Sequence, residues 1–161
     1  MTEPLRSISD IASYHAHIYY DEATRPIAAV LRAAIEQTFT VVMGRWRDEP
    51  VGPHPQAMYQ VAFEAAEFPK IVPWLMLNRQ GLVVLVHPNT GDAVADHDLN
   101  PLWLGEKLPL RIEFLRTFVK ANPGVSAGAI IPHGSGRIIR LRRSKTPAAD
   151  SLLPFWWKAE G

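Results

Sequence analysis

The chain has 161 residues, of which 47% are hydrophobic and 20% charged, and its formal net charge is +1. This size and composition are typical of one domain with a sizeable core, and the small net charge gives no general attraction to nucleic acid or membranes. The absence of cysteine excludes disulfides, iron–sulfur clusters and thiolate catalysis, which leaves histidine and carboxylate side chains to bind any metal. Residues 1–10 lack the apolar region of a signal peptide, and no stretch approaches the roughly 18 apolar residues that span a membrane, so we expect a cytoplasmic protein.

Residues 14–20 predict a β-strand, because aromatic and β-branched side chains alternate there with a period of two. One face carries Ala16, Ile18 and Tyr20, and the other carries His15, His17 and Tyr19. The Cα atoms of the two histidines would lie about 6–7 Å apart, which is close enough for both imidazoles to reach one ion. The alternative is a pair of surface or packing histidines, because a His-x-His pair alone is a weak signal.

The rest of the chain predicts three helices and three further strands. The helices are expected over 25–38, 67–79 and 110–120, and the strands over 39–46, 58–64 and 82–87. A proline-rich connection over 47–56 carries His54, and a loop over 89–105 carries Asp96, His97 and Trp103. Pro73 should kink the second helix or mark its start, and Pro88 should stop the last strand.

The order strand-helix-strand-strand-helix-strand indicates an α+β fold, a ferredoxin-like antiparallel sheet with helices on one face. Its strand order, 4-1-3-2, would place His15 beside His87, with His17 one step along the same face. Gln60 and Glu64 would join them from the next strand. The face without helices would therefore collect several groups that can bind a metal.

Three neutral imidazoles, or two and the Glu64 carboxylate, would leave open positions on a divalent ion. Two histidines with one carboxylate suit ferrous iron, whereas three histidines suit zinc or iron, and the spacing does not separate these cases. We expect the nearest ring nitrogens of His15, His17 and His87 to lie about 3–4 Å apart, as metal–nitrogen bonds of about 2.1 Å require.

Two further histidines are candidates for proton transfer. His54 lies between two prolines in a loop that topology places at the opposite end of the sheet from His15, from which it could reach the same face or a partner subunit. His97 follows Asp96, and this pair could be a general base, a hydrogen-bonding support for ligands or part of a solvated loop. Tyr19, Tyr59 and Trp103 could line a pocket for an aromatic substrate, although Tyr59 equally suits the core.

The chain divides into a predicted domain over 11–124 and a C-terminal extension over 125–161. The extension could form a hairpin from 125–131 and 137–141. The arginine-rich stretch 137–145 could bind phosphate, although a solvated edge strand is the simpler interpretation. Residues 152–157 are apolar enough to dock on the domain or on a partner.

Several blocks together resemble the DOPA 4,5-dioxygenase family, over about 11–105. They are Tyr14-His15-Ala16-His17, Gly44-Arg45-Trp46, Val51-Gly52-Pro53-His54-Pro55, residues 58–63, 74–79 and 84–90, Asp96-His97 and Trp103-Leu104-Gly105. The resemblance implies a ferredoxin-like fold, usually dimeric, and extradiol cleavage of a catechol such as DOPA by O2 at a non-haem ferrous iron. Zinc could replace the iron in the isolated protein.

In this interpretation His15, His17 and His87 bind the metal, and His54 or His97 removes a hydroxyl proton. Tyr19, Gln60 and Trp103 contact the substrate, and the product is a yellow semialdehyde. The chain departs from the family pattern at Arg47, where members often have histidine, and at Asn100, near which they have another. The alternative function is a dimeric ferredoxin-like protein that binds a small molecule or metal without turnover. Nucleic acid is not an expected partner.

Overall fold

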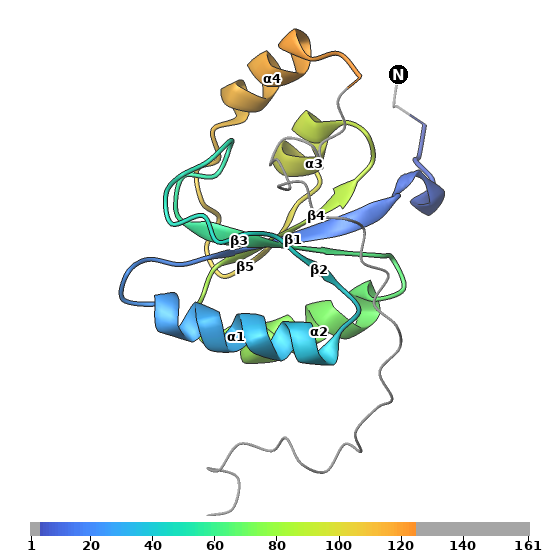
Figure 1. Cartoon of the computed structure of the whole chain (residues 1–161). Coiled ribbons are helices and arrows are strands. Elements are labelled where there is room, and N and C mark those ends of the chain that lie inside the picture. The colour runs from blue at the N-terminus through green and yellow to red at the C-terminus, as the bar shows by residue number, and fades with distance from the viewer. Residues whose placement is uncertain (1–3, 125–161) are drawn as a thin grey trace, which may run out of the picture.

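The computed structural model describes residues 4–124, which form a five-stranded antiparallel sheet with helices (Figure 1). The elements are η1 (Ile8–Asp10), β1 (Ser13–Tyr19), α1 (Arg25–Thr38), β2 (Val42–Met43), β3 (Met58–Phe63), α2 (Phe68–Asn78), β4 (Val84–Asn89), α3 (Ala93–Asp98), β5 (Leu102–Leu104) and α4 (Ile112–Ala121). This architecture confirms the predicted α+β, ferredoxin-like class. The predicted C-terminal extension lies outside the described residues.

The sheet has the order β2-β3-β1-β4-β5, which is the predicted order with one strand added at the β4 edge. The central strand β1 pairs with β4 so that His15 lies opposite His87, and with β3 so that His17 lies opposite Gln60. Directly paired residues point to the same side of a sheet, so these four side chains share one face.

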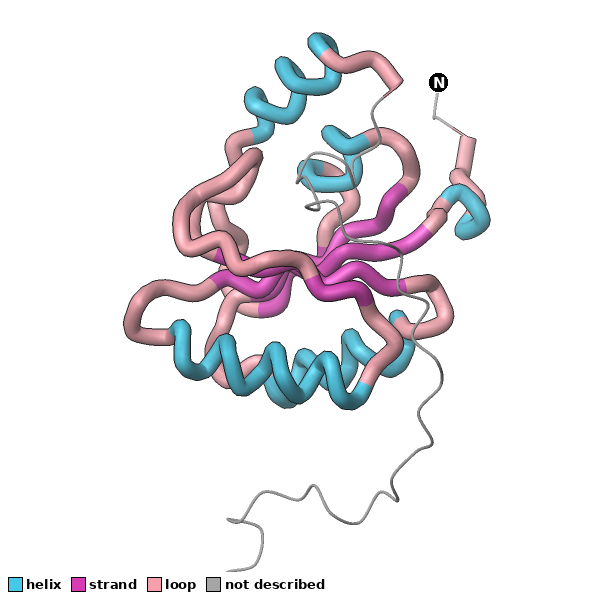
Figure 2. The backbone as a smooth tube through the Cα atoms, in the orientation of Figure 1, coloured by secondary structure: helices cyan, strands magenta, loops and turns pink. Residues whose placement is uncertain are grey.

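Helices α1 and α2 cover the other face of the sheet (Figures 1 and 2). The main core lies between them and includes Ala16 and Ile18 from β1, Leu31 and Ile35 from α1, and Leu75 from α2. Leu31 and Ile35 are four residues apart, a spacing that places both on one side of a helix. The histidines of β1 therefore point away from α1 and α2, as their alternation predicts.

The histidine face is not open, in contrast to the prediction. Helices α3 and α4 and the loop between β2 and β3 lie on that side of the sheet (Figure 1). A second, smaller core forms there from Tyr19, Met58, Leu85 and Leu108. The apolar part of this face is thus covered by the chain's own loops.

Three element boundaries differ from the sequence-based expectation. The strand expected over 39–46 is reduced to β2, and α3 and β5 lie where a loop was expected. Strand β4 continues through Pro88, which pairs with Tyr14 on β1. This is possible because β5 pairs with β4 only as far as Val86. Pro88 has no backbone N–H, and among the described residues no strand lies beside it on that side to accept a hydrogen bond from one. No helix among the described residues is long and apolar enough to cross a membrane.

Candidate metal centre

Five of the six histidines form one cluster on the sheet face opposite α1 and α2. They are His15 and His17 from β1, His87 from β4, His97 from α3 and His54 from the loop before β3. None of the five is more than 6% exposed. Burial of so many imidazoles in one place is unusual, because histidine is more often partly exposed.

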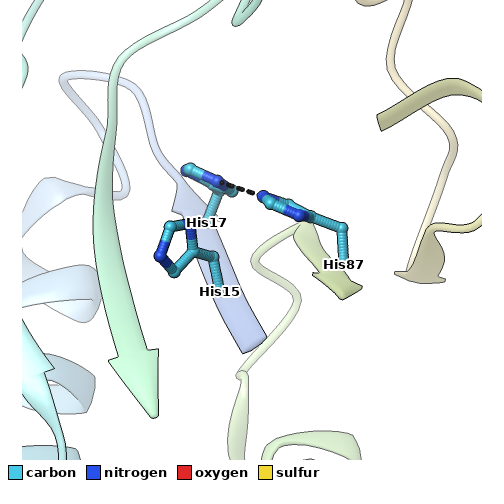
Figure 3. A group of neighbouring side chains, drawn as sticks. All are labelled: His15, His17 and His87. Atoms are coloured by element: carbon cyan, nitrogen blue, oxygen red, sulfur yellow. Dashed lines mark hydrogen bonds between the residues drawn. The ribbon is translucent and has the colours of Figure 1, made fainter. Parts of the chain in front are cut away.

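The three predicted metal ligands lie together (Figure 3). The Nε2 atoms of His17 and His87 are 3.1 Å apart, and one ring nitrogen from each of His15, His17 and His87 lies within 4.8 Å of the others. The rings of His15 and His87, which face each other across the strands, have centroids 5.2 Å apart. Their coordination of a metal stays a prediction, but the side chains have the convergence that it requires.

A second group joins His17 to His54 and His97, again with ligand atoms within 4.8 Å. The His17 and His54 rings lie 4.1 Å apart, and those of His87 and His97 lie 4.0 Å apart. The His54 loop joins the sheet at the Tyr19 end of β1, opposite the His15 end, and His54 nevertheless reaches the same face, which is one of the two possibilities left open by the sequence.

The His54 loop folds back over the sheet because its backbone is bound by the segment before α4. The Arg111 backbone N–H donates to the Pro53 carbonyl at 2.8 Å, and the Arg111 guanidinium donates to the His54 carbonyl at 3.1 Å. The His54 N–H donates to the Val51 carbonyl at 3.0 Å, which closes a turn. The two bonds from Arg111 are long-range and leave no local signal in the sequence of the loop.

Burial favours the uncharged form of four of the clustered imidazoles. It lowers the pKa of His17 and of His87 well below the ordinary value of 6.5, and the neighbouring histidines lower both further. Burial also lowers the pKa of His54 to about 3 and reduces the pKa of His97. Neutral imidazole is the form that binds a metal, so the cluster is prepared for ligation at neutral pH.

Backbone carbonyls fix the orientation of two rings. The Nδ1 atom of His87 lies 2.8 Å from the Pro88 carbonyl, and that of His97 lies 2.9 Å from the Ala93 carbonyl. A carbonyl oxygen only accepts, so each Nδ1 carries the proton and each Nε2 keeps its lone pair. This is the arrangement typical of metal-binding histidines in proteins.

The sequence model of the Dopa 4,5-dioxygenase family matches residues 14–114, which include all five clustered histidines. The chain belongs to this family. A DOPA 4,5-dioxygenase from Amanita muscaria is 32% identical over 113 residues, which cover 65% of this chain and 50% of that protein. An uncharacterized 21.2 kDa protein from Botryotinia fuckeliana is 35% identical over 127 residues, or 71% and 69% of the two chains.

A solved structure supports the fold of this family member. The crystal structure of a candidate dioxygenase from Nostoc punctiforme is 55% identical, with a TM-score of 0.70. The similarity covers 71% of this chain and 99% of that one. In contrast, the chain spans half the length of the Amanita enzyme, so the activity of that whole protein is carried over here only as a proposal.

The predicted substrate contacts of this Dopa 4,5-dioxygenase family member also lie on the histidine face. Gln60 is opposite His17, and Trp103 is opposite Leu85. The Gln60 Nε2, Trp103 Nε1 and His17 Nδ1 atoms are buried and have no hydrogen-bond partner among the described residues. Buried polar atoms of this kind are costly unless something binds them, which fits a site that receives a polar ligand.

Glu64, the alternative to a third histidine, does not reach the cluster. Glu64 follows the end of β3 and is exposed, and among the described residues no carboxylate joins either group of histidines. Asp96 is fully buried beside His97, but it accepts hydrogen bonds from the Thr90 N–H at 2.9 Å and the Thr90 hydroxyl at 2.6 Å. Asp96 therefore anchors α3 to the end of β4, and does not serve as a free base.

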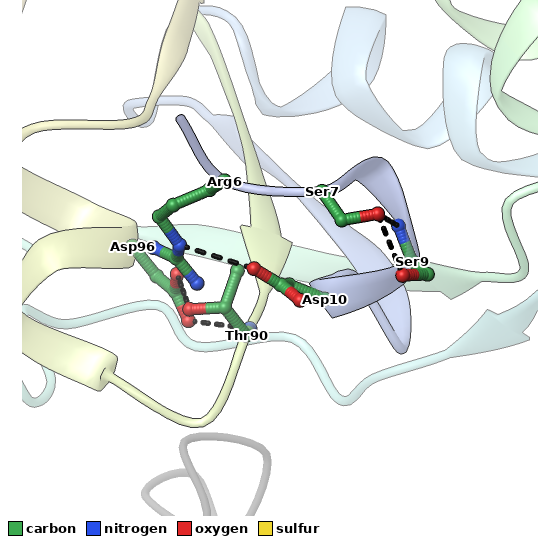
Figure 4. Close-up of polar contacts among 6 residues, drawn as sticks. All are labelled: Arg6, Ser7, Ser9, Asp10, Thr90 and Asp96. Atoms are coloured by element: carbon green, nitrogen blue, oxygen red, sulfur yellow. Dashed lines mark hydrogen bonds and ion pairs between the residues drawn. The ribbon is translucent and has the colours of Figure 1, made fainter. Parts of the chain in front are cut away.

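A cavity of about 330 Å³ adjoins His87 at the end of β1 and β4. Its apolar wall includes Tyr14 and Leu102, and Arg6 and Asp10 also line it. The Arg6 Nε donates to the Asp10 carboxylate at 3.3 Å (Figure 4). The sequence interpretation missed this region, because residues 1–10 resemble a polar lead-in and their approach to the sheet depends on the short helix η1.

Proposed function

We propose that the protein is a non-haem iron-dependent extradiol dioxygenase that cleaves a catechol such as DOPA with O2. The observation that carries this proposal is the convergence of His15, His17 and His87, three buried imidazoles held by two paired strands. Membership of the Dopa 4,5-dioxygenase family supports the reaction class.

The donor set fits a ferrous ion bound by His15, His17 and His87. Imidazole suits iron and zinc alike, and three protein ligands leave positions for a substrate. The bound iron would supply the redox chemistry that activates O2 and the catechol. Because the ligands are neutral, the site would keep the full charge of the ion and would favour an anionic ligand such as catecholate.

His97 is the residue best placed to take a proton from a catechol hydroxyl. Its Nδ1–H donates to the Ala93 carbonyl, so that the Nε2 lone pair is available, and its ring lies 4.0 Å from that of His87. Burial lowers the pKa of His97, so the imidazole is unprotonated and ready to accept a proton at neutral pH.

The test is to load the metal-free protein with ferrous iron under anaerobic conditions and to add DOPA in air. We expect O2 uptake equal to DOPA consumed and a yellow product. The zinc-loaded protein and His87→Ala are the controls and should give neither. If the iron-loaded protein binds metal and DOPA without O2 uptake, the alternative function as a binding protein replaces this proposal.

A further inference from the structure

A short hydrogen bond joins Tyr19 to His54 at the edge of the histidine cluster. The Tyr19 hydroxyl lies 2.7 Å from His54 Nδ1, and each residue is 1% exposed. Tyr19 is held by β1, where its ring stacks on Trp103 with centroids 6.1 Å apart. The two bonds from Arg111 hold the backbone of the His54 loop. Neither partner of this contact can move away easily.

The direction of this bond follows from the hydroxyl. The ordinary pKa of a tyrosine hydroxyl is about 10, so the phenol keeps its proton at neutral pH. The described residues offer the Tyr19 hydroxyl no other hydrogen-bond partner. If His54 Nδ1 carried a proton and donated it, the hydroxyl proton would be buried without an acceptor, which is unfavourable. The favourable arrangement has the Tyr19 hydroxyl donating to His54 Nδ1.

We infer that Tyr19 fixes His54 in the tautomer with the proton on Nε2, so that His54 presents an N–H donor to the cluster and is not a metal ligand. Nδ1 is occupied by Tyr19, so Nε2 is the nitrogen left to face His17 and His97. The inference about the tautomer is independent of the proposed function. Only its use in catalysis depends on that function.

In the other two histidines whose orientation is fixed, the ring proton is on Nδ1 and not on Nε2. In His87 and His97 a backbone carbonyl takes the Nδ1 proton, so that both present an Nε2 lone pair. The cluster therefore combines rings that can bind a metal or accept a proton with one ring that can only donate. Within the group of His17, His54 and His97, His54 is the member that would not coordinate an ion.

In the proposed reaction this donor would stabilise negative charge on an oxygen atom, and it would not release its proton. Loss of the Nε2 proton would leave an imidazolate, or a tyrosinate if Tyr19 passed its own proton to Nδ1. Burial disfavours both anions. A preorganised N–H directed at a developing oxyanion is a common catalytic device, and it leaves the role of base to His97.

The tautomer can be measured in the metal-free protein by two-bond ¹⁵N–¹H NMR of labelled histidine, with His54→Ala to assign the signal. We expect a protonated Nε2 on His54 and a protonated Nδ1 on His87. In Tyr19→Phe the proton of His54 should redistribute between both nitrogens. Tyr59→Phe is the matched control, because it removes a buried hydroxyl that donates to the Ala28 carbonyl in the main core. A His54 proton on Nδ1 in the unaltered protein would overturn the inference.

Metal analysis and kinetics give a second readout. His54→Ala and Tyr19→Phe should keep stoichiometric metal, and kcat should fall on the order of 100-fold for His54→Ala, with a smaller change in KM. Loss of metal in His54→Ala would make His54 a ligand and refute the inference. If the NMR result holds but the unaltered protein turns over no catechol, the proposed function fails while the tautomer assignment stands.

Discussion

His15, His17 and His87 should each be required for metal binding, because three neutral imidazoles are needed to hold one ion at this face. We expect alanine at any of the three to remove stoichiometric iron or zinc while the protein stays folded. His133→Ala is the matched control, since His133 is the one histidine that lies outside the described residues. The metal content of the purified variants tests ligation, and their thermal unfolding tests whether they are folded. Full metal occupancy in His87→Ala would show that other residues are the ligands.

The buried histidines should also make the metal-free protein sensitive to mild acid. Below about pH 6.5 the unfolded chain binds protons on histidine, whereas the lowered pKa values of His17, His54, His87 and His97 oppose protonation of these side chains in the folded state. The unfolded state then binds more protons, so the free energy of unfolding falls as the pH falls, by about 1.4 kcal/mol per pH unit for each such histidine.

Urea unfolding between about pH 7 and pH 5 measures this slope, because most carboxylates titrate lower. His54→Gln should reduce the dependence of the free energy of unfolding on pH by the contribution of one histidine. His133→Gln should leave that dependence unchanged. A free energy of unfolding that is constant over this range would contradict the lowered pKa values.

At the scale of elements, α3 depends on its anchors. A helix of six residues is unstable alone, and α3 is held by the Asp92 side chain, which caps Val94 and Ala95, and by the bonds between Asp96 and Thr90. Thr90→Val removes one of the two bonds to a buried carboxylate. We expect a loss of about 1–3 kcal/mol in the free energy of unfolding.

Hydrogen exchange followed by mass spectrometry locates that loss. In Thr90→Val the amides of α3 should exchange faster, while those of β1 at the centre of the sheet keep their protection relative to global unfolding. Thr117→Val on the exposed side of α4 serves as the control. Unchanged exchange in α3 would show that Asp96 does not hold the helix.

The sequence predicted the elements whose patterns are local. Alternation in β1 placed His15 and His17 on one face, and the split β-α-β order correctly predicted His87 as the neighbour of His15. Helix α3 is too short for a periodic pattern, although Asp92 before it is a capping signal that could have indicated it. The position of His54 could not be predicted, because it depends on a hydrogen bond from the guanidinium of Arg111, 57 residues along the chain, to the His54 carbonyl.

At the scale of the whole molecule, the described residues form two cores. The main core lies between the sheet and the helices α1 and α2, and the smaller one lies on the histidine side. We therefore propose that residues 125–161 form a separate extension. A chain ending at residue 124 should keep the unfolding temperature and the metal stoichiometry of the full chain. A fall of many degrees would show that the extension belongs to the domain.

Dimerisation stays a prediction. Comparing the full chain with the chain that ends at residue 124 can test it. Met76 and Leu77 on α2, together with Val30 on α1, are exposed apolar side chains that a second copy could cover. We expect sedimentation to show a dimer for both lengths of chain. A dimer that is lost on truncation would assign the contact to the extension, and a monomer in both cases would refute the prediction.

The pairing of His15 with His87 across β1 and β4 links metal binding to strand registration. A shift of β1 by one residue would turn both of its histidines toward α1 and α2 and would dismantle the ligand set. An ion that binds all three rings therefore stabilises one alignment of two strands that lie far apart in the chain. Refolding with zinc present should thus give a larger yield of native protein than refolding with a chelator, because the ion selects the correct alignment.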